Sequence, residues 1–283
     1  MLALVLGLGA GIVYGVADFV GGLASRRSPL LPVLLVSQLF GTSLLLVAFP
    51  FVVSGSATSL ALGWGAAAGV AGAGGVALLY RGLARGRMSI VAPVTSVNAA
   101  SLPVIWGLAT GERPGALAIT GVVISLTAVA LVSWSGESVA EPRRRWIDEP
   151  GLLDAIGAGT CFGFFFIFLS FSPDDSSLWP LVGARVASLT TFALVAATTR
   201  TAVRPPPHSL RLIAAAGLLD VLANLLYLLA TREGLLSLVA VLTSLYPAST
   251  VLLARVVLQE RMQRLQLVGL ALAAAGVTLI AAR

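Results

Sequence analysis

Charged and polar side chains are scarce in this sequence. Only 11% of its 283 residues are charged, whereas 58% are hydrophobic, and the mean hydropathy is +0.98. A soluble domain has about 25% charged and roughly 45–50% apolar residues, so this chain lacks the polar groups needed to cover a surface that faces water. Its apolar runs recur at about 20 residues, the length that crosses a bilayer as a helix. The composition excludes an ordinary soluble domain and predicts an integral membrane protein.

Lysine is absent, and each of the 18 basic residues is an arginine. The net charge of +6 comes from small arginine groups between apolar runs. They form neither a basic domain nor a stripe with interleaved aromatics, so nucleic-acid binding is not indicated. Arginines beside membrane spans act as topology signals, and that interpretation accounts for their positions. We expect the lipid bilayer, and no nucleic acid, as a partner.

Cysteine and histidine each occur once. A single cysteine, Cys161, excludes an internal disulfide, and a thiolate metal centre needs more ligands. The single histidine, His208, stands beside a proline-rich stretch in an expected loop. An intramembrane enzyme would need a nucleophile–base pair or a metal set within the spans. We therefore expect no catalytic residues, no metal site, no cofactor and no enzymatic activity.

Ten apolar segments, separated by arginines, glycines, prolines or acids, are long enough to span a membrane. The first lacks a basic start and is longer than the apolar core of a signal peptide, so we expect a mature helix. The expected spans are residues 2–22, 31–53, 61–80, 88–109, 115–134, 152–171, 178–199, 210–230, 235–258 and 265–282. The one plausible linker is SGESVAEPRRRWIDEPG, residues 135–151, which divides the chain nearly in half.

The two halves repeat each other when the second is shifted by 148 positions, the interval between Glu112 and Glu260. The matching pairs are 9–11 with 157–159, Gly15 with Gly163, Pro32 with Pro180, Thr95-Ser96 with Thr243-Ser244, Glu112-Arg113 with Glu260-Arg261 and Gly121 with Gly269. With a one-residue slip, 78–80 falls on 225–227 and Arg85 on Arg232. Apolar matches alone arise by chance, but polar and proline matches in the same order indicate a duplication.

The duplication predicts two five-helix units, residues 1–134 and 152–283, joined by the charged linker 135–151. Because five is odd, the second unit must enter the bilayer from the opposite side. Inverted repeats of this kind enclose a site near the midplane and allow alternating access. We predict an all-α integral membrane protein with ten transmembrane helices, arranged as two inverted five-helix repeats.

Arginines are distributed unequally between the two sets of loops. The loops after the odd-numbered spans hold Arg26, Arg27, Arg81, Arg85, Arg87, Arg143, Arg144, Arg145, Arg200, Arg204, Arg211, Arg261 and Arg264. The opposite side holds Arg113, Arg232 and Arg283. The positive-inside rule places the arginine-rich side in the cytoplasm and both termini outside. We expect a multi-pass protein of the cell membrane.

The ends of the two units carry a shared pattern. The segments are VAPVTSVNAASLPVIWGLATGERPGALAITGVVISLTAVALV (91–132) and VAVLTSLYPASTVLLARVVLQERMQRLQLVGLALAAAGVTLI (239–280). In each, a helix with proline, a Glu-Arg turn and a glycine-bearing last helix follow in order. With the ten-span layout, this resembles the drug/metabolite transporter superfamily, specifically proteins with two EamA-type domains.

The resemblance implies secondary transport of small metabolites or drugs, often export, without ATP hydrolysis by the protein. Amino-acid-like compounds are the substrate class that it suggests. It also implies cytoplasmic termini, opposite to the arginine count, because the family places basic residues after the second span and this chain has Arg26-Arg27 after the first. The arginine usual in the second span matches Arg185, whereas the first unit has Ser37-Gln38.

Four ionisable residues fall inside expected spans: Asp18, Arg185, Asp220 and Arg255. Each costs about 2.5–3.5 kcal/mol by insertion scales, so such groups face protein or a wet cavity. Asp18 either binds a cationic substrate group or a coupling proton, or pairs with a loop arginine at the helix end. Arg185 either holds a substrate carboxylate through its planar fork or pairs structurally with Asp220. Arg255 is expected to reach toward the Glu260 end.

Asp220, Asn224 and Tyr227 are four and then three residues apart, which places them on one helical face. Such a stripe faces a cavity or a partner helix. Prolines in the fourth and ninth spans free backbone carbonyls, and the hydroxyls nearby either line a cavity or pack between helices. The candidate substrate-binding residues are Tyr14, Asp18, Tyr80, Thr95, Asn98, Arg185, Asp220, Asn224, Tyr227, Thr243 and Tyr246.

Other features favour structural roles. We interpret Glu112 and Glu260, each at a helix junction, as caps and interface charges. The glycine-rich stretch 69–75 has the small residues that let helices approach closely. The leading hypothesis is a transporter of a small molecule, with proton coupling through Asp18 or Asp220 left open. A flippase for lipids or lipid-linked sugars is the main alternative; a channel or scaffold is a further one.

Overall fold

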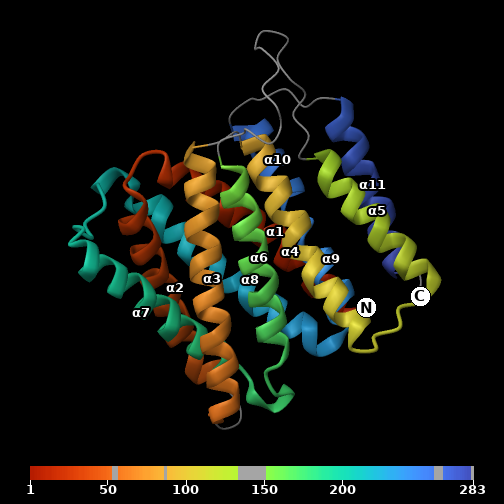
Figure 1. The fold of residues 1–283 in the computed structure, drawn as a ribbon, viewed down its shortest axis with the longest axis horizontal. Helices are drawn as coiled ribbons and strands as arrows, with labels where there is room; N and C mark the ends of the chain where they lie inside the picture. Colours follow the sequence, from red (N-terminus) through yellow and green to blue (C-terminus); the bar gives the residue numbers. More distant parts are fainter. Residues whose placement is uncertain (53–56, 86–87, 133–150, 258–263, 282–283) are drawn as a thin grey trace.

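The computed structural model describes residues 1–52, 57–85, 88–132, 151–257 and 264–281. The described residues form α-helices and two short 3-10 turns, with no strand among them (Figure 1). The helices are α1 (Leu2–Ser25), α2 (Leu30–Val52), α3 (Ser59–Arg85), α4 (Met88–Ala109), α5 (Ala116–Val132), α6 (Leu152–Ser170), α7 (Trp179–Thr199), α8 (Leu210–Glu233), α9 (Leu236–Thr243), α10 (Tyr246–Val257) and α11 (Arg264–Ala281). The 3-10 turns are η2 (Asp174–Ser176) and η3 (Pro207–Ser209).

Each apolar segment expected from the sequence is helical in the described residues. In the part of the chain that the structure describes, six stretches are long and apolar enough to cross a membrane: Leu2–Ser25, Leu30–Val47, Ser59–Leu83, Leu152–Ser170, Trp179–Thr199 and Pro207–Glu233. Four shorter apolar helical stretches among these residues are Val94–Ala109, Ala116–Ala128, Leu236–Thr250 and Leu267–Gly276, the third of which contains a turn at residues 244–245. Large hydrophobic side chains such as Val5, Val186 and Leu194 are more than half exposed, as expected where helices face lipid. Ten crossings remain a prediction.

The ninth expected span, 235–258, is wrong as a single helix. It consists of α9, which ends at Thr243, and α10, which begins at Tyr246. Pro247 has no backbone N–H and cannot donate to the carbonyl of Thr243, so the helix is interrupted just before it. The matching helix of the first half, α4, is continuous although it contains Pro103.

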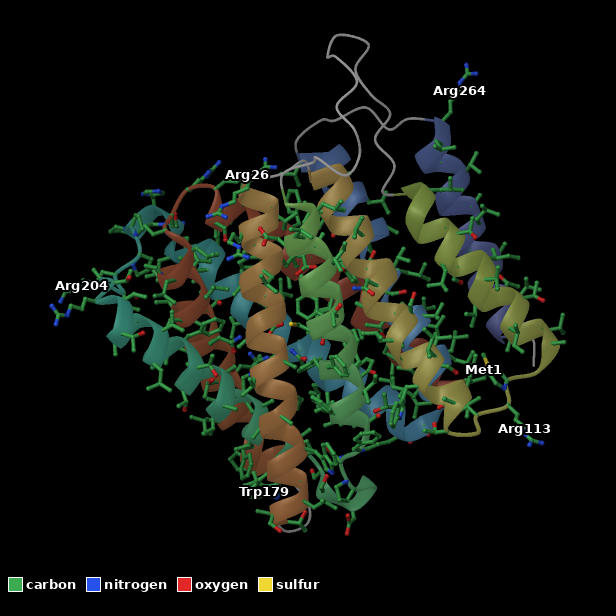
Figure 2. The ribbon with its side chains drawn as sticks, in the orientation of Figure 1. Met1, Arg26, Arg113, Trp179, Arg204 and Arg264 are labelled. Atoms are coloured by element: carbon green, nitrogen blue, oxygen red, sulfur yellow. The ribbon has the colours of Figure 1, made fainter. Side chains whose placement is uncertain are left out.

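The long helices run back and forth between two ends of the molecule (Figures 1 and 2). Arg26, Arg204 and Arg264 lie toward one end, whereas Met1 and Arg113 lie toward the other (Figure 2). The helix α1 runs toward the end with Arg26, and α6, the first helix of the second half, runs in the opposite direction (Figure 1). The described arginines that Figure 2 labels are thus concentrated at one end, as the loop count indicates.

The helix contacts between the two halves occur in matched pairs. The helix α1 packs on α8, and its counterpart α6 packs on α3. Similarly, α2 packs on α8 and α7 on α3, while α4 packs on α6 and α1 on α9 and α10. The last helices of the two halves, α5 and α11, pack on each other. Exchanging each helix for its counterpart therefore reproduces these pairings.

Two hydrogen bonds repeat in the same way. Thr95 Oγ1 donates to the carbonyl oxygen of Ala155 at 3.2 Å, and Thr243 Oγ1 donates to that of Gly7 at 3.4 Å. Both donors and both acceptors are related by the 148-residue shift. The duplicated residues thus make equivalent contacts across the interface between the halves.

Glu112 caps a helix of the other half. Its carboxylate oxygens accept hydrogen bonds from the backbone N–H groups of Leu236 at 2.8 Å and Ser237 at 3.1 Å. These N–H groups begin α9 and have no partner within that helix, and a negative charge there also stabilises the helix dipole. The interpretation of Glu112 as a cap is confirmed. Glu260 and the linker 135–150 lie outside the described residues.

Replacing Glu112 with alanine should therefore loosen the interface between the halves. We expect Glu112→Ala to lower the free energy of unfolding by about 1–2 kcal/mol, the usual cost of losing a helix cap, measured by denaturation in detergent micelles. Glu233→Ala is the matched control, because Glu233 is exposed near the same junction. Equal losses in the two variants would show that the cap contributes no stability.

Candidate functional site

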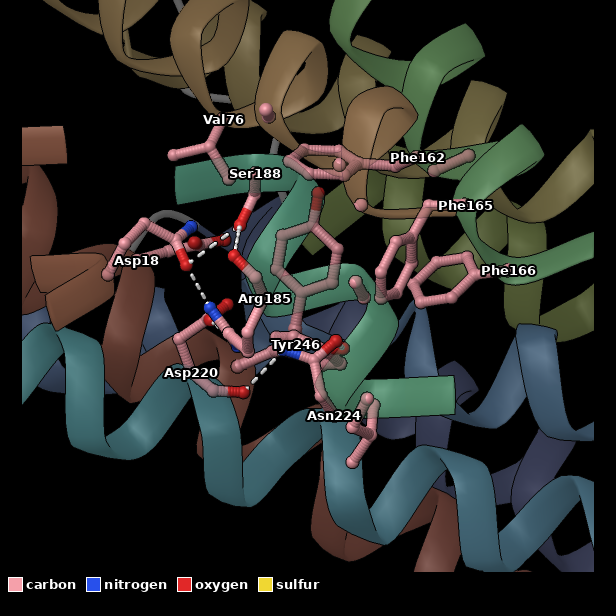
Figure 3. A pocket seen from close by; sticks show the side chains of 18 residues that line it. Asp18, Val76, Phe162, Phe165, Phe166, Arg185, Ser188, Asp220, Asn224 and Tyr246 are labelled. Atoms are coloured by element: carbon pink, nitrogen blue, oxygen red, sulfur yellow. Dashed lines mark hydrogen bonds and ion pairs between the residues drawn. The ribbon is translucent and has the colours of Figure 1, made fainter. Parts of the chain in front are cut away.

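A pocket lies between the two halves of the chain (Figure 3). It has about 750 Å³ of empty space, including the part open to the outside. Its wall comes from α1, α2, α3 and α4 of the first half and from α6, α7, α8 and α10 of the second. These are four helices and their counterparts under the repeat, so both units contribute equivalent elements to one cavity.

Arg185 is the centre of the polar side of this pocket. It is buried, with 7% of its surface exposed, and its Nη2 donates to Oδ2 of Asp220 at 2.5 Å. Its Nη1 donates to Oε1 of Gln38, which also accepts a hydrogen bond from Ser188 Oγ at 3.3 Å. One guanidinium therefore connects α7 to α8 and to α2. The ion pair between Arg185 and Asp220 is one of the two roles that the sequence left open for Arg185.

A second polar chain joins α1 to α8. The hydroxyl of Tyr14 donates to Oδ1 of Asn224 at 2.8 Å, and Nδ2 of Asn224 donates to the backbone oxygen of Asp220 at 2.6 Å. Residues on one face of α8 therefore contact both the first helix of the chain and, through Arg185, the helices α2 and α7. This is the partner face expected for the polar stripe of that span.

Asp18 also lines the pocket. Within the described part of the chain, its carboxylate makes no hydrogen bond and no ion pair. The pairing with a loop arginine that the sequence allowed is therefore not observed among these residues. Asp18 presents a carboxylate to the cavity beside the engaged Arg185 and Asp220 (Figure 3).

The other side of the pocket is aromatic. Phe162, Phe165 and Phe166 line it, and Figure 3 shows them opposite Asp18 and Asp220. The ring of Tyr14 meets Phe166 edge-on, with centroids 6.3 Å apart. The pocket therefore has a charged side and an apolar side, which is typical of sites for small organic molecules.

The structure brings six of the expected binding residues to this pocket: Tyr14, Asp18, Arg185, Asp220, Asn224 and Tyr246. Five others lie elsewhere among the described helices: Tyr80, Thr95, Asn98, Tyr227 and Thr243. Thr95 and Thr243 bond to backbone oxygens of facing helices, and Asn98 Nδ2 donates to Ile156 at 2.8 Å. Their hydroxyl and amide groups thus serve contacts between helices.

The two remaining tyrosines are buried between helices. Tyr227 is fully buried, and its ring packs on Phe166 with centroids 4.4 Å apart. Tyr80 packs against Gly21, where an added Cβ would lie 1.9 Å from the tyrosine oxygen. A role of either side chain in binding a substrate remains a prediction.

Several lining residues were not expected from the sequence: Gln38, Ser188, Phe162, Phe165 and Phe166. Gln38 had a detectable signal, because it lies 147 positions before Arg185 and so matches it under the slipped repeat. The phenylalanines belong to the run FGFFFIF at 162–168. In an apolar helix, the sequence alone does not show whether such rings line a pocket or face lipid.

Residues 149–282 match the model of the EamA-like transporter family. A solved structure described only as "Crystal structure of protein" has the same fold: 16% of residues are identical, the similarity covers 98% of this chain and 95% of that one, and the TM-score is 0.73. No protein with a curated description matches the chain. The second half is therefore similar to membrane transporters of the drug/metabolite type, and the apolar helices are those of a multi-pass membrane protein. A second EamA-type domain in the first half stays a prediction.

Proposed function

We propose that this protein is a secondary transporter that moves a small organic metabolite or drug across the cell membrane, as an exporter of amino-acid-like compounds. The observation that carries the proposal is the pocket with one charged and one aromatic side, built by four helices and their counterparts. The match of residues 149–282 to a transporter family supports it. That match does not favour the flippase alternative.

The proposed mechanism is alternating access by two inverted repeats. The opposite directions of α1 and α6 (Figure 1) and the exchangeable helix contacts support the inversion. If each half adopts two conformations, exchanging them between the halves opens the pocket to one side and then to the other. The arginine-rich end, with Arg26 and Arg264, would then face the cytoplasm.

The pocket offers partners for the parts of an amino-acid-like compound. Asp18 and Asp220 are acceptors for an amine, Arg185 holds Asp220 in place through their ion pair, and the phenylalanines accommodate an apolar body. Asp18 or Asp220 is also the proposed site of a coupling proton, because ionisable groups inside spans act in proton relays.

Reconstituted protein tests the proposal. We expect proteoliposomes to accumulate amino-acid-like solutes faster than protein-free liposomes, and faster still with a pH gradient. Asp220→Asn should reduce the flux at least tenfold, whereas Asp175→Asn, an exposed acid outside the pocket, should leave it unchanged. A flux that does not change with the pH gradient would contradict proton coupling. A flux in Asp220→Asn equal to that of the wild type would show that Asp220 is not part of the transport site.

A further inference from the structure

The charges of the pocket do not balance. Three side chains with a carboxyl or guanidinium group line it: Asp18, Arg185 and Asp220. Arg185 and Asp220 form an ion pair, which leaves the carboxylate of Asp18 as the group without a counter-charge in the described part of the chain. An empty pocket with both acids ionised therefore carries a net negative charge.

Arg185 is not available to a second carboxylate. Its guanidinium already donates to Asp220 and to Gln38, and Ser188 holds the same oxygen of Gln38. Only 8% of its side chain is exposed, against 29% for that of Asp220. A substrate carboxylate would have to displace Asp220 and would bring a third negative charge next to two acids, and burying such a charge without a partner is costly.

Asp18 is the free acceptor. It lines the cavity and has no hydrogen bond or ion pair within the described residues. An ammonium group placed there would form a charge-assisted hydrogen bond. The rings of Phe162, Phe165 and Phe166 form the opposite side (Figure 3), where a flat apolar body fits and where cations are also attracted to ring faces.

We propose that the pocket selects organic amines that lack a free carboxylate, with the ammonium at Asp18 and a flat apolar body against Phe162, Phe165 and Phe166. The proposal rests on the proposed function and narrows its substrate class. Among amino-acid-like compounds, it favours the decarboxylated or carboxyl-blocked forms. The selectivity arises because Arg185, the one cationic side chain among the described lining residues, is engaged, whereas the carboxylate of Asp18 is not.

Three ligands with the same phenyl body separate the effect of charge from that of shape. They are phenethylamine, phenylalanine and 3-phenylpropionate, tested at neutral pH by equilibrium dialysis with the purified full chain in detergent. Phenethylamine should bind at least tenfold tighter than phenylalanine, and 3-phenylpropionate should bind weakest. Asp18→Asn should weaken phenethylamine binding at least tenfold, while Asp175→Asn should leave it unchanged.

The wild-type comparison does not depend on how any variant folds. Phenylalanine binding as tightly as phenethylamine would overturn the proposal, as would no measurable phenethylamine binding or unchanged binding in a folded Asp18→Asn variant. Transport is judged separately in proteoliposomes. Phenylalanine flux without phenethylamine flux would overturn the proposed selectivity for amines, but it would still support the proposed transport function. Tight phenethylamine binding without flux of any solute would support the selectivity and contradict the transporter.

Discussion

Replacing Arg185 with methionine is expected to lower the free energy of unfolding by about 3 kcal/mol and to abolish transport. The change leaves Asp220 in the pocket wall without its counter-charge and removes the donor to Gln38. Breaking a buried pair by removing one partner costs about 3–5 kcal/mol, and the lower end applies because 29% of the Asp220 side chain is exposed. Denaturation in detergent and flux in proteoliposomes measure the two effects.

The double variant Arg185→Met with Asp220→Asn separates the structural role of the pair from its role in transport. It contains no unpaired charge at this position, so most of the lost stability should return. Transport should not return, because the pocket has lost both charged members of the pair. Normal transport in the double variant would show that the pair only holds helices together. Arg204→Met is the control, because Arg204 is exposed away from the pocket, and it should change neither quantity.

The helices could be predicted because their signal is local. An apolar run about 20 residues long with a polar break at each end specifies a membrane helix whatever its neighbours are. Asp18, Arg185 and Asp220 could be predicted for the same reason, since a charge in an apolar run is conspicuous and expensive. The structure places all three at the pocket, although their roles there remain proposals.

The rest of the site could not be predicted because it depends on which helix faces which. Thr95 and Thr243 are polar residues of a type that often lines cavities, yet their hydroxyls donate hydrogen bonds to backbone oxygens of α6 and α1. Phe165 and Phe166 are apolar residues of a type usually found in a protein core, yet they line the cavity. A single sequence does not show whether a hydroxyl donates to the backbone of a neighbouring helix. Nor does it show whether an aromatic ring lies beside a pocket.

The repeat carries information that neither half contains alone. Gln38 and Arg185 occupy equivalent places under the slipped repeat, and they meet in a hydrogen bond across the pocket. A position where the two units differ in charge is thus a place where they touch. Where the two halves of a duplicated protein carry different residues at equivalent positions, those residues therefore indicate the part of a site that can bind the two ends of a ligand differently.

Replacing Gly69 with alanine is expected to be strongly disruptive for a change that adds a single methyl group in α3. A Cβ at this position would lie 2.2 Å from the carbonyl oxygen of Ala184 in α7, and backbone cannot move aside as a side chain can. The two helices must separate, so the free energy of unfolding should fall by about 2–3 kcal/mol, toward the upper end for an overpacked core. Because Ala184 precedes Arg185, the separation also displaces the guanidinium from Asp220, and transport should be lost.

Gly63→Ala, in the same helix, is the matched control. A Cβ there meets nothing within 4 Å, so the variant should gain about 0.5–1 kcal/mol from the lower entropy of its unfolded chain. The repeat adds a second test, because Gly217 in α8 lies 148 positions after Gly69 and its Cβ would lie 1.9 Å from the carbonyl oxygen of Ser37 in α2. Gly217→Ala should therefore be as damaging as Gly69→Ala. If denaturation shows that only one of the two variants is destabilised, the halves do not pack as equivalent units and the alternating-access proposal loses its structural basis.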